Sequence, residues 1–426
     1  MTAITLEPET VALSRRQWAA KWKVSIILGI FALIGLVMFV ILGRPGESTF
    51  VLSTAKEFIQ LPNVVLPSQA AGIVFELLLI AGVVRSVFAI RAGRPTPLWV
   101  IGVFGAVFLI AFLNWAAAGQ LPIPVPGLLI GAVAGAVPLI FGALGGVISE
   151  RSGVVNVAIE GQLLAGAFVS AVVASATQQP VLGLLAAMVA GVLVSFVLAA
   201  FAIKYVVDQV IVGVVLNVLV AGLTSFLYTT LLSPNQETLN SPPRFDTIDI
   251  PLLSQIPIIG PVLFSQTIIV YVAYVAVALV WFGLFKTRWG LRVRAVGEHP
   301  KAADTVGINV NSTRFWNVSL AGAIAGFGGA YFTIGSVGGF TKEMTAGAGF
   351  IALAAVIFGR WDPIKATLAA LLFGFATNLQ SVLTIIGSPV PSEFMLMLPY
   401  VITIFAVAGF VGQSRAPAAS GKAYIK

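Results

Sequence analysis

The sequence predicts an all-α polytopic membrane protein, and three features support this prediction: hydropathy, the shortage of charge and the length of the apolar runs. Of the 426 residues, 58% are hydrophobic and 9% are charged, and the mean hydropathy is +1.02. A soluble globular chain carries about 25% charged residues, so this chain lacks the side chains to cover a water-facing surface. Its charge-free runs repeatedly reach the roughly 20 residues that a helix needs to cross a bilayer.

Turn signals divide these runs into about 12 predicted transmembrane segments. Two of the breaks rest on proline, at 120–126 and at 177–180, because proline lacks an amide donor and clashes with the preceding helical turn. The tenth segment has only about 13 residues, which is short for a full crossing, so we expect a half-helix, a re-entrant segment or a thin crossing packed inside protein. The predicted segments are 24–42, 69–90, 98–117, 128–148, 154–176, 181–203, 209–232, 266–285, 314–336, 347–359, 364–386 and 393–412.

The placement of Lys and Arg predicts that both termini are cytoplasmic, because cytoplasmic loops carry the excess of these residues. With twelve crossings, most of the 24 Lys and Arg residues fall on one side of the membrane, including those of the long loop 286–313. The proline-rich loop 233–265 then lies outside. The net charge of +8 is therefore a topology signal and not a nucleic-acid-binding patch. The Lys and Arg residues that do not fall on the cytoplasmic side are Arg85, within a span, and Arg44, Lys56, Arg244 and Lys342, outside.

The residue inventory argues against several chemistries. The chain contains no cysteine and one histidine, which excludes disulfides and thiolate metal sites and argues against a histidine metal cage. We therefore expect no metal and no cofactor.

The loop 286–313 is predicted to contain a short helix lying parallel to the membrane. Pro300 suits a first helical turn, the residues up to Asp304 are good helix formers, and Gly307 can cap the end. Glu298 precedes this helix, where the helix dipole favours an anion. Such a projection would suit a membrane protein driven by a soluble motor, and an ordinary amphipathic connector is the alternative.

An internal repeat is a further expectation. A Gly-rich span, a polar loop and a second small-residue span occur at 128–168 and again at 320–358. The two sets are offset by five spans, an odd number, so the halves would be inverted in the membrane, as in many transporter folds. The alternative is that small residues recur because helices pack closely.

Four passages resemble one family. Residues 290–308 are similar to the coupling segment of ABC importer permeases of the branched-chain amino acid, ribose and nucleoside group. Ser149-Glu-Arg-Ser-Gly-Val-Val-Asn-Val-Ala-Ile-Glu-Gly161 has the form typical of nucleoside and simple-sugar permeases, and 208–217 and 349–359 also match. His299 departs from the pattern, since relatives more often have Asn there.

The resemblance covers about 128–411. It makes 1–127 an N-terminal extension with about three transmembrane helices, 128–411 the permease core and 412–426 a cytoplasmic tail.

The resemblance implies the permease subunit of an importer for nucleosides in the inner (cytoplasmic) membrane. Family members pair, bind two cytoplasmic ATP-binding subunits and receive solute from an extracytoplasmic solute-binding lipoprotein. The second permease subunit is expected to be a paralogue, although pairing with itself stays open. Because the sequence has no Gly-x-x-x-x-Gly-Lys-[Ser/Thr] loop, ATP hydrolysis is assigned to another subunit and the chain is expected to be non-catalytic. The implied ATPase-coupling residues are Glu298, His299, Pro300, Lys301, Ala302, Ala303 and Asp304.

Polar residues within the spans are few and are candidates for the translocation path. Glu160 is placed about seven residues inside the fifth span, with Asn156 one turn earlier on the same face. They could bond ribose hydroxyls or base edges. The alternative, which we favour for Glu160, is that its carboxylate accepts hydrogen bonds from the backbone, or from Ser149 and Arg151, and holds a helix break together. Uncharged amides suit a neutral solute, and interhelical hydrogen bonding is their alternative role; these candidates are Asn217, Asn378 and Gln380.

Other functions remain as alternatives. The same machinery could import simple sugars or branched-chain amino acids. An ion-coupled secondary transporter would need mid-membrane acids paired with a gating base, for which the spans offer Glu76, Arg85 and Glu160. A membrane enzyme acting on lipid-linked substrates would need clustered acids or histidines. The densest acidic group, Asp246 and Asp249, lies in the external loop without a nearby His.

Overall fold

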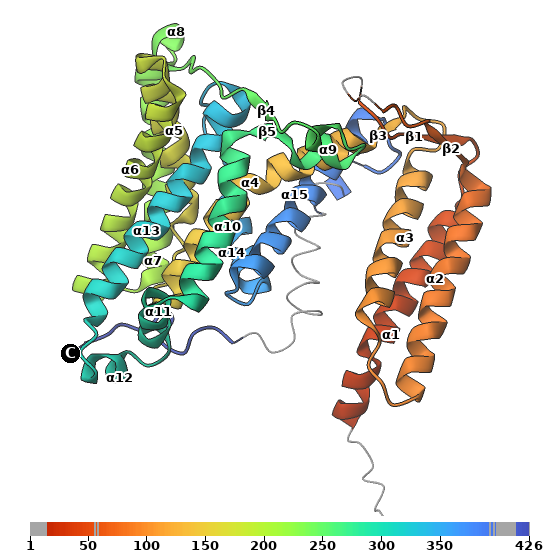
Figure 1. Cartoon of the computed structure of the whole chain (residues 1–426), viewed down its shortest axis with the longest axis horizontal. Helices are drawn as coiled ribbons and strands as arrows, with labels where there is room; N and C mark the ends of the chain where they lie inside the picture. Colours follow the sequence, from red (N-terminus) through yellow and green to blue (C-terminus); the bar gives the residue numbers. More distant parts are fainter. Residues whose placement is uncertain are drawn as a thin grey trace, which may run out of the picture. The chain divides into compact units, whose positions relative to one another are not determined.

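The computed structural model describes residues 15–54, 57, 59–391, 393–394, 397 and 415–425, with side chains from residue 22 onward (Figure 1). In this part of the chain, ten helices are long and apolar enough to cross a membrane. The predicted all-α polytopic architecture is confirmed. The last predicted segment, 393–412, lies almost entirely outside the described residues.

The chain divides into two compact units, of which the first contains residues up to 52, 62–124 and 382–391. Its three long helices pack through aromatic rings, such as Phe31 edge-on to Phe108 with centroids 5.3 Å apart. A buried hydrogen bond of 2.5 Å joins the hydroxyls of Ser25 and Ser86. A small sheet with strand order β2-β1-β3 accompanies the helices. The elements are α1 (Arg15–Gly35), its π-helical continuation η1 (Leu36–Ile41), β1 (Glu47–Val51), β2 (Val64–Pro67), α2 (Ser68–Arg91), α3 (Leu98–Ala116) and β3 (Ile123–Pro124).

The second unit contains the remaining long helices. The proline breaks predicted from the sequence are present, since α4 begins directly after Pro124 and α6 begins at Pro180. The long elements are α4 (Val125–Arg151), α5 (Ile159–Thr177), α6 (Pro180–Ala199) with η2 (Ala200–Lys204), α7 (Gln209–Leu227) with η3 (Tyr228–Leu232), α10 (Ile268–Lys286), α13 (Val310–Ala330) with η5 (Tyr331–Val337), α14 (Ala348–Phe358) and α15 (Pro363–Ile385), whose residues up to 381 belong to this unit.

Glycines let α13 lie in backbone contact with α5 and α6. A Cβ atom added to Gly166 of α5 would lie 2.2 Å from the carbonyl oxygen of Gly326 in α13. One added to Gly191 of α6 would lie 2.0 Å from the carbonyl oxygen of Gly322. Real Cβ atoms do not approach so closely, so glycine at these positions fixes the spacing of the three helices.

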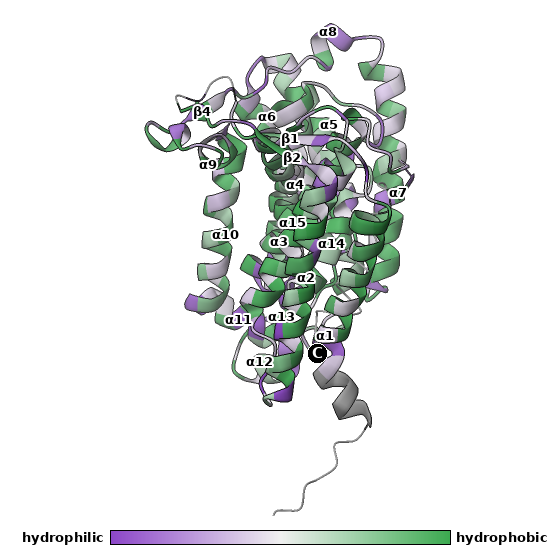
Figure 2. Ribbon diagram, turned by 90° about the vertical axis from the view of Figure 1, so that its right-hand side faces the viewer, coloured by the Kyte–Doolittle hydropathy of each residue, from purple (hydrophilic) through white to green (hydrophobic). Residues whose placement is uncertain are grey.

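The connections of the second unit gather at its two ends. One end carries α8 (Gln236–Leu239), the β4–β5 pair (Thr247–Asp249 with Ser265–Thr267), the 3-10 turn η4 (Leu253–Gln255) and α9 (Ile259–Leu263). The opposite end carries α11 (Arg288–Glu298), α12 (Pro300–Thr305) and the C-terminal residues (Figure 1). Hydrophilic residues concentrate at α8 and β4 and at α11 and α12, with hydrophobic helices between them (Figure 2).

The short tenth segment is present as α14, which has 11 residues. At 1.5 Å per residue such a helix spans about 16 Å, roughly half of a bilayer's hydrocarbon thickness. The inverted repeat stays a prediction. The structure shows that α4 and α13–η5 are each followed by an irregular stretch, 152–158 and 338–347, before the next helix starts.

Candidate functional site

The short helix expected at Pro300 is present as α12, and the sequence explains both of its ends. Pro300 is its first residue, where a missing amide hydrogen costs nothing. At the other end Gly307 has φ +85°, and its amide donates to the carbonyl of Asp304 (3.0 Å). The amide of Ile308 donates to the carbonyl of Ala303 (3.0 Å), which completes a Schellman cap. Its role in coupling stays a prediction.

The seven predicted coupling residues divide by exposure. Ala303 is buried in a small cluster with Val296 and Val310, so α12 is packed onto the protein and is not a free loop. Pro300 and Asp304 are half-buried. The exposed ones, available to a partner, are Glu298, His299, Lys301 and Ala302.

The stretch before α12 is helical too, although its residue pattern gave no indication of a helix. The side chain of Thr287 accepts a hydrogen bond from the amide of Gly290 (3.2 Å) and so caps the start of α11. A Cβ on Gly297, near the end of α11, would lie 2.1 Å from the carbonyl oxygen of Arg151, the last residue of α4. The end of α11 therefore rests directly on the end of α4.

From α4 the contacts continue to the turn between α14 and α15. The Arg151 guanidinium Nε donates to the carbonyl of Trp361 (3.0 Å), and the Trp361 indole Nε1 donates to the buried carboxylate of Glu150 (2.5 Å). Trp361 adopts φ +54°, an unfavourable conformation for a bulky residue that these two bonds help to hold. Movement of α11 would thus reach α4, α14 and α15 through direct contacts.

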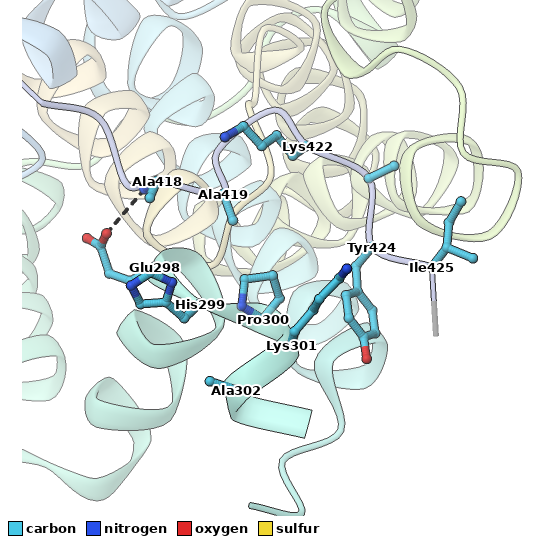
Figure 3. Close-up of a pocket in the computed structure, with 11 residues that line it drawn as sticks. Glu298, His299, Pro300, Lys301, Ala302, Ala418, Ala419, Lys422, Tyr424 and Ile425 are labelled. Carbon is cyan, nitrogen blue, oxygen red and sulfur yellow. Dashed lines mark hydrogen bonds between the residues drawn. The ribbon is translucent and has the colours of Figure 1, made fainter. Parts of the chain in front are cut away.

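The C-terminal residues lie against α11 and α12 (Figure 3). The amide of Ala419 donates to the carbonyl of Gly297 (2.9 Å), and the amide of Ala418 donates to the carboxylate of Glu298 (3.2 Å). The two segments line a cleft of about 530 Å³. Nothing in the sequence pattern signalled this contact, because the tail has neither helical nor strand periodicity.

Two further contacts anchor the tail. The carbonyl of Lys422 accepts a 2.8 Å hydrogen bond from the guanidinium of Arg314, a residue that is only 2% exposed. The hydroxyl of Tyr424 hydrogen-bonds with the carboxylate of Asp304. Burial, together with this carboxylate, raises the pKa of the Tyr424 phenol above its ordinary value, so the tyrosine is neutral and able to donate at physiological pH.

The expectation that Asn156 and Glu160 share one helix face is wrong. Helix α5 begins only at Ile159, so Asn156 lies in the irregular stretch 152–158 and Glu160 is in the first helical turn. Asn156 is fully buried, and its side chain exchanges hydrogen bonds with Gln162 (3.0 and 3.2 Å). The break predicted at 149–153 lies at 152–158 in the structure, where local side-chain hydrogen bonds take the place of helical ones.

Glu160 joins α5 to the start of α14. Its half-buried carboxylate accepts hydrogen bonds from the Thr345 hydroxyl (2.6 Å) and from the amides of Gly347 (2.9 Å) and Gly349 (2.6 Å). Neither Ser149 nor Arg151 is among these partners. The Glu160 carboxylate thereby satisfies two backbone amides at the start of α14 that have no partner within the helix. The helix dipole favours a negative charge at this end.

The amide candidates also bond between segments. Asn217 of α7 donates to the carbonyl of Val157 (2.9 Å) and accepts from the amide of Gly161 (2.8 Å). The half-buried Asn378 of α15 donates to the carbonyl of Leu128 in α4 (2.7 Å), and Gln380 is half-buried as well. Whether any of them faces solute stays a prediction. Among the described residues, no group of three or more His, Cys, Asp or Glu could hold a metal ion.

Residues 128–407 match the family model described as branched-chain amino acid transport system / permease component. The chain is 45% identical to the guanosine ABC transporter permease protein NupQ of Bacillus subtilis over 304 residues. This matched region covers 68% of the present chain and 94% of NupQ. It is 43% identical over 302 residues to the nucleoside ABC transporter permease protein NupC of Lactococcus lactis subsp. cremoris (68% and 93%). A more distant relative is the glucose ABC transporter permease protein TsgB13 of Haloferax volcanii, 31% identical over 252 residues (56% and 65%). No solved structure matches.

Proposed function

Since this chain belongs to the branched-chain amino acid transport system / permease component family, we propose that it is the membrane-spanning subunit of an ATP-binding cassette importer for nucleosides. The main support for this proposal is the 45% identity to a guanosine permease over 94% of that relative's length. Simple sugars are the second candidate, because a glucose permease is also among the relatives.

In this proposal, ATP is hydrolysed by a separate cytoplasmic subunit that docks on α12. The exposed face of α12 and its rigid capping support this role, as does the chain of contacts from α11 through α4 to α14 and α15. The proposed assembly also includes a second permease subunit, a paralogue of this chain, and an extracytoplasmic solute-binding lipoprotein at the end that carries α8 and α9. The residues before 128 lie outside the family match, and we assign them to an N-terminal extension.

The docking assignment is tested by changing only exposed residues. Lys301→Glu with Ala302→Glu alters the outer face of α12 and leaves the buried Ala303 in place. The matched control places two glutamates at Gln236 and Thr238 of α8, exposed residues at the opposite end. Affinity purification from the native membrane, with mass spectrometry of the co-purifying proteins, should show loss of the ATP-binding subunit for the first variant only. Retention by both variants would contradict the docking role.

The orientation is tested with single cysteines, because the native chain has none. We propose that α12 is cytoplasmic and α8 is outside. A membrane-impermeant maleimide applied to intact cells should then label Gln236→Cys and leave Lys301→Cys unlabelled until the cells are opened. The reverse pattern would invert the proposed topology.

A further inference from the structure

The C-terminal residues form part of the same exposed surface as α12. The cleft is lined on one side by Glu298, His299, Pro300, Lys301 and Ala302, and on the other by the tail (Figure 3). Four hydrogen bonds to α11, α12 and α13, described above, fix the tail there. The tail is therefore a built component of this end of the protein.

The buried end of Arg314 indicates how firmly the tail is held. Its Nη1 donates to the Lys422 carbonyl, whereas its Nε and Nη2 are buried without a partner in the described part of the chain. A buried guanidinium is costly unless it is hydrogen-bonded, so losing the Lys422 carbonyl would remove the one bond that the structure gives it. Tail and core thus depend on each other at this point.

The outward side of the tail has the character of a protein-binding surface. Ile425 in the cleft is 74% exposed, and Val306, which directly follows α12, is 75% exposed. Lys301 and Lys422 line the same cleft as Ile425, and both are exposed. Exposed large apolar side chains together with exposed cations favour a partner whose surface is apolar and acidic.

We propose that residues 418–425 form, together with α12, one composite docking surface for the ATP-binding subunit. This inference rests on the proposed function and extends it, because the coupling contact would then involve two chain segments separated by more than a hundred residues. It predicts that the facing region of the ATP-binding subunit carries acidic residues around an apolar centre.

The test uses the full chain, purified together with its native partners. The affinity tag is at the amino terminus, so that the C-terminal tail stays free. Lys422→Glu with Ile425→Asp changes only exposed side chains and leaves the anchoring contacts of the backbone and of Tyr424 in place. The control, Ile259→Asp, makes the same apolar-to-acid change at a 52% exposed residue of α9. We expect the tail variant to retain about tenfold less ATP-binding subunit than the wild type, and the control to retain the same amount.

A second variant ends the chain after Pro417 and removes all four anchoring contacts. We expect it to lose the ATP-binding subunit as well, while its elution in size-exclusion chromatography stays that of folded protein. Both tail variants could retain as much ATP-binding subunit as the wild type while the Lys301→Glu, Ala302→Glu variant loses it. That result would overturn the composite surface and leave the proposed function standing. A wild-type chain that retains no ATP-binding subunit would overturn both.

Discussion

Glu160 offers the sharpest test of whether a polar residue in this core reads the solute or holds the helices. Glu160→Gln keeps the size of the side chain but replaces one acceptor oxygen with an NH₂ group. Two backbone amides and one hydroxyl donate to the native carboxylate. An amide cannot accept all three bonds with equal strength, and its NH₂ group would face N–H donors.

The magnitude follows from those three bonds. A hydrogen bond to a charged group contributes about 1.5–3 kcal/mol, whereas interhelical bonds in membranes average about 0.6 kcal/mol. Taking about 1 kcal/mol for each bond of this half-buried group, and allowing the glutamine to keep one, the loss is about 2 kcal/mol. In a core of this size that corresponds to a fall of a few degrees, roughly 3 °C, in the apparent melting temperature.

The assay measures melting in detergent and guanosine uptake in cells on the same variant. We expect the melting temperature to fall and maximal uptake to decrease, with the KM for guanosine changing by less than about twofold. Glu237→Gln on the exposed helix α8 is the matched control and should change neither quantity. An unchanged melting temperature together with a large rise in KM would refute the structural role and place Glu160 in the translocation path.

Three further predictions concern packing, a buried bond and the tail. Gly166→Ala should lower the melting temperature strongly, at a cost of about 1–3 kcal/mol in stability, because its Cβ would meet the α13 backbone at 2.2 Å. Gly222→Ala should be neutral or slightly stabilising, because no atom lies within 4 Å of the added Cβ. Trp361→Phe should cost about 1–3 kcal/mol, measured by melting, because the buried Glu150 carboxylate loses its indole donor. Deprotonation of Tyr424 ends its donation to a carboxylate, and its pKa is raised, so tail docking should persist at neutral pH and weaken only as the pH rises above the ordinary pKa of a phenol.

Each of these has a matched comparison. Equal melting of the two glycine variants would contradict the close approach of α5 and α13. Trp316→Phe, at a 63% exposed tryptophan, is the control for Trp361→Phe and should have little effect. The tail is followed by electron paramagnetic resonance between spin labels at cysteines introduced at Ala302 and Ile425. A distance that lengthens at high pH in the wild-type background but not with Tyr424→Phe supports the prediction, and identical pH profiles contradict it.

The sequence predicted those features that depend on local residue types. Hydropathy and run length located the ten described spans, proline placed the starts of α6 and α12, and the short apolar run predicted α14. These predictions succeed because each depends on a few neighbouring residues. Bilayer thickness sets the length of an apolar run, proline lacks an amide hydrogen, and glycine tolerates positive φ.

Features that depend on tertiary contacts were missed. The break between the fourth and fifth spans, predicted at 149–153, lies at 152–158, where the buried pair Asn156 and Gln162 stabilises it. Helix α11 contains Gly290 and Gly297, poor helix formers whose role is to let it approach α10 and α4. The tail, which has no periodicity, is ordered by bonds to Arg314 and Asp304 that no short window of sequence could reveal.

Uptake of labelled guanosine into cells measures whether this chain carries nucleosides with energy from a separate ATP-binding subunit. Cells lacking the chain should fail to accumulate guanosine, and the wild-type chain should restore accumulation, whereas the Lys301→Glu, Ala302→Glu variant should not. Excess unlabelled adenosine should compete with the label, and glucose should not. Full accumulation by the variant would contradict coupling through α12, and competition by glucose alone would contradict the nucleoside assignment.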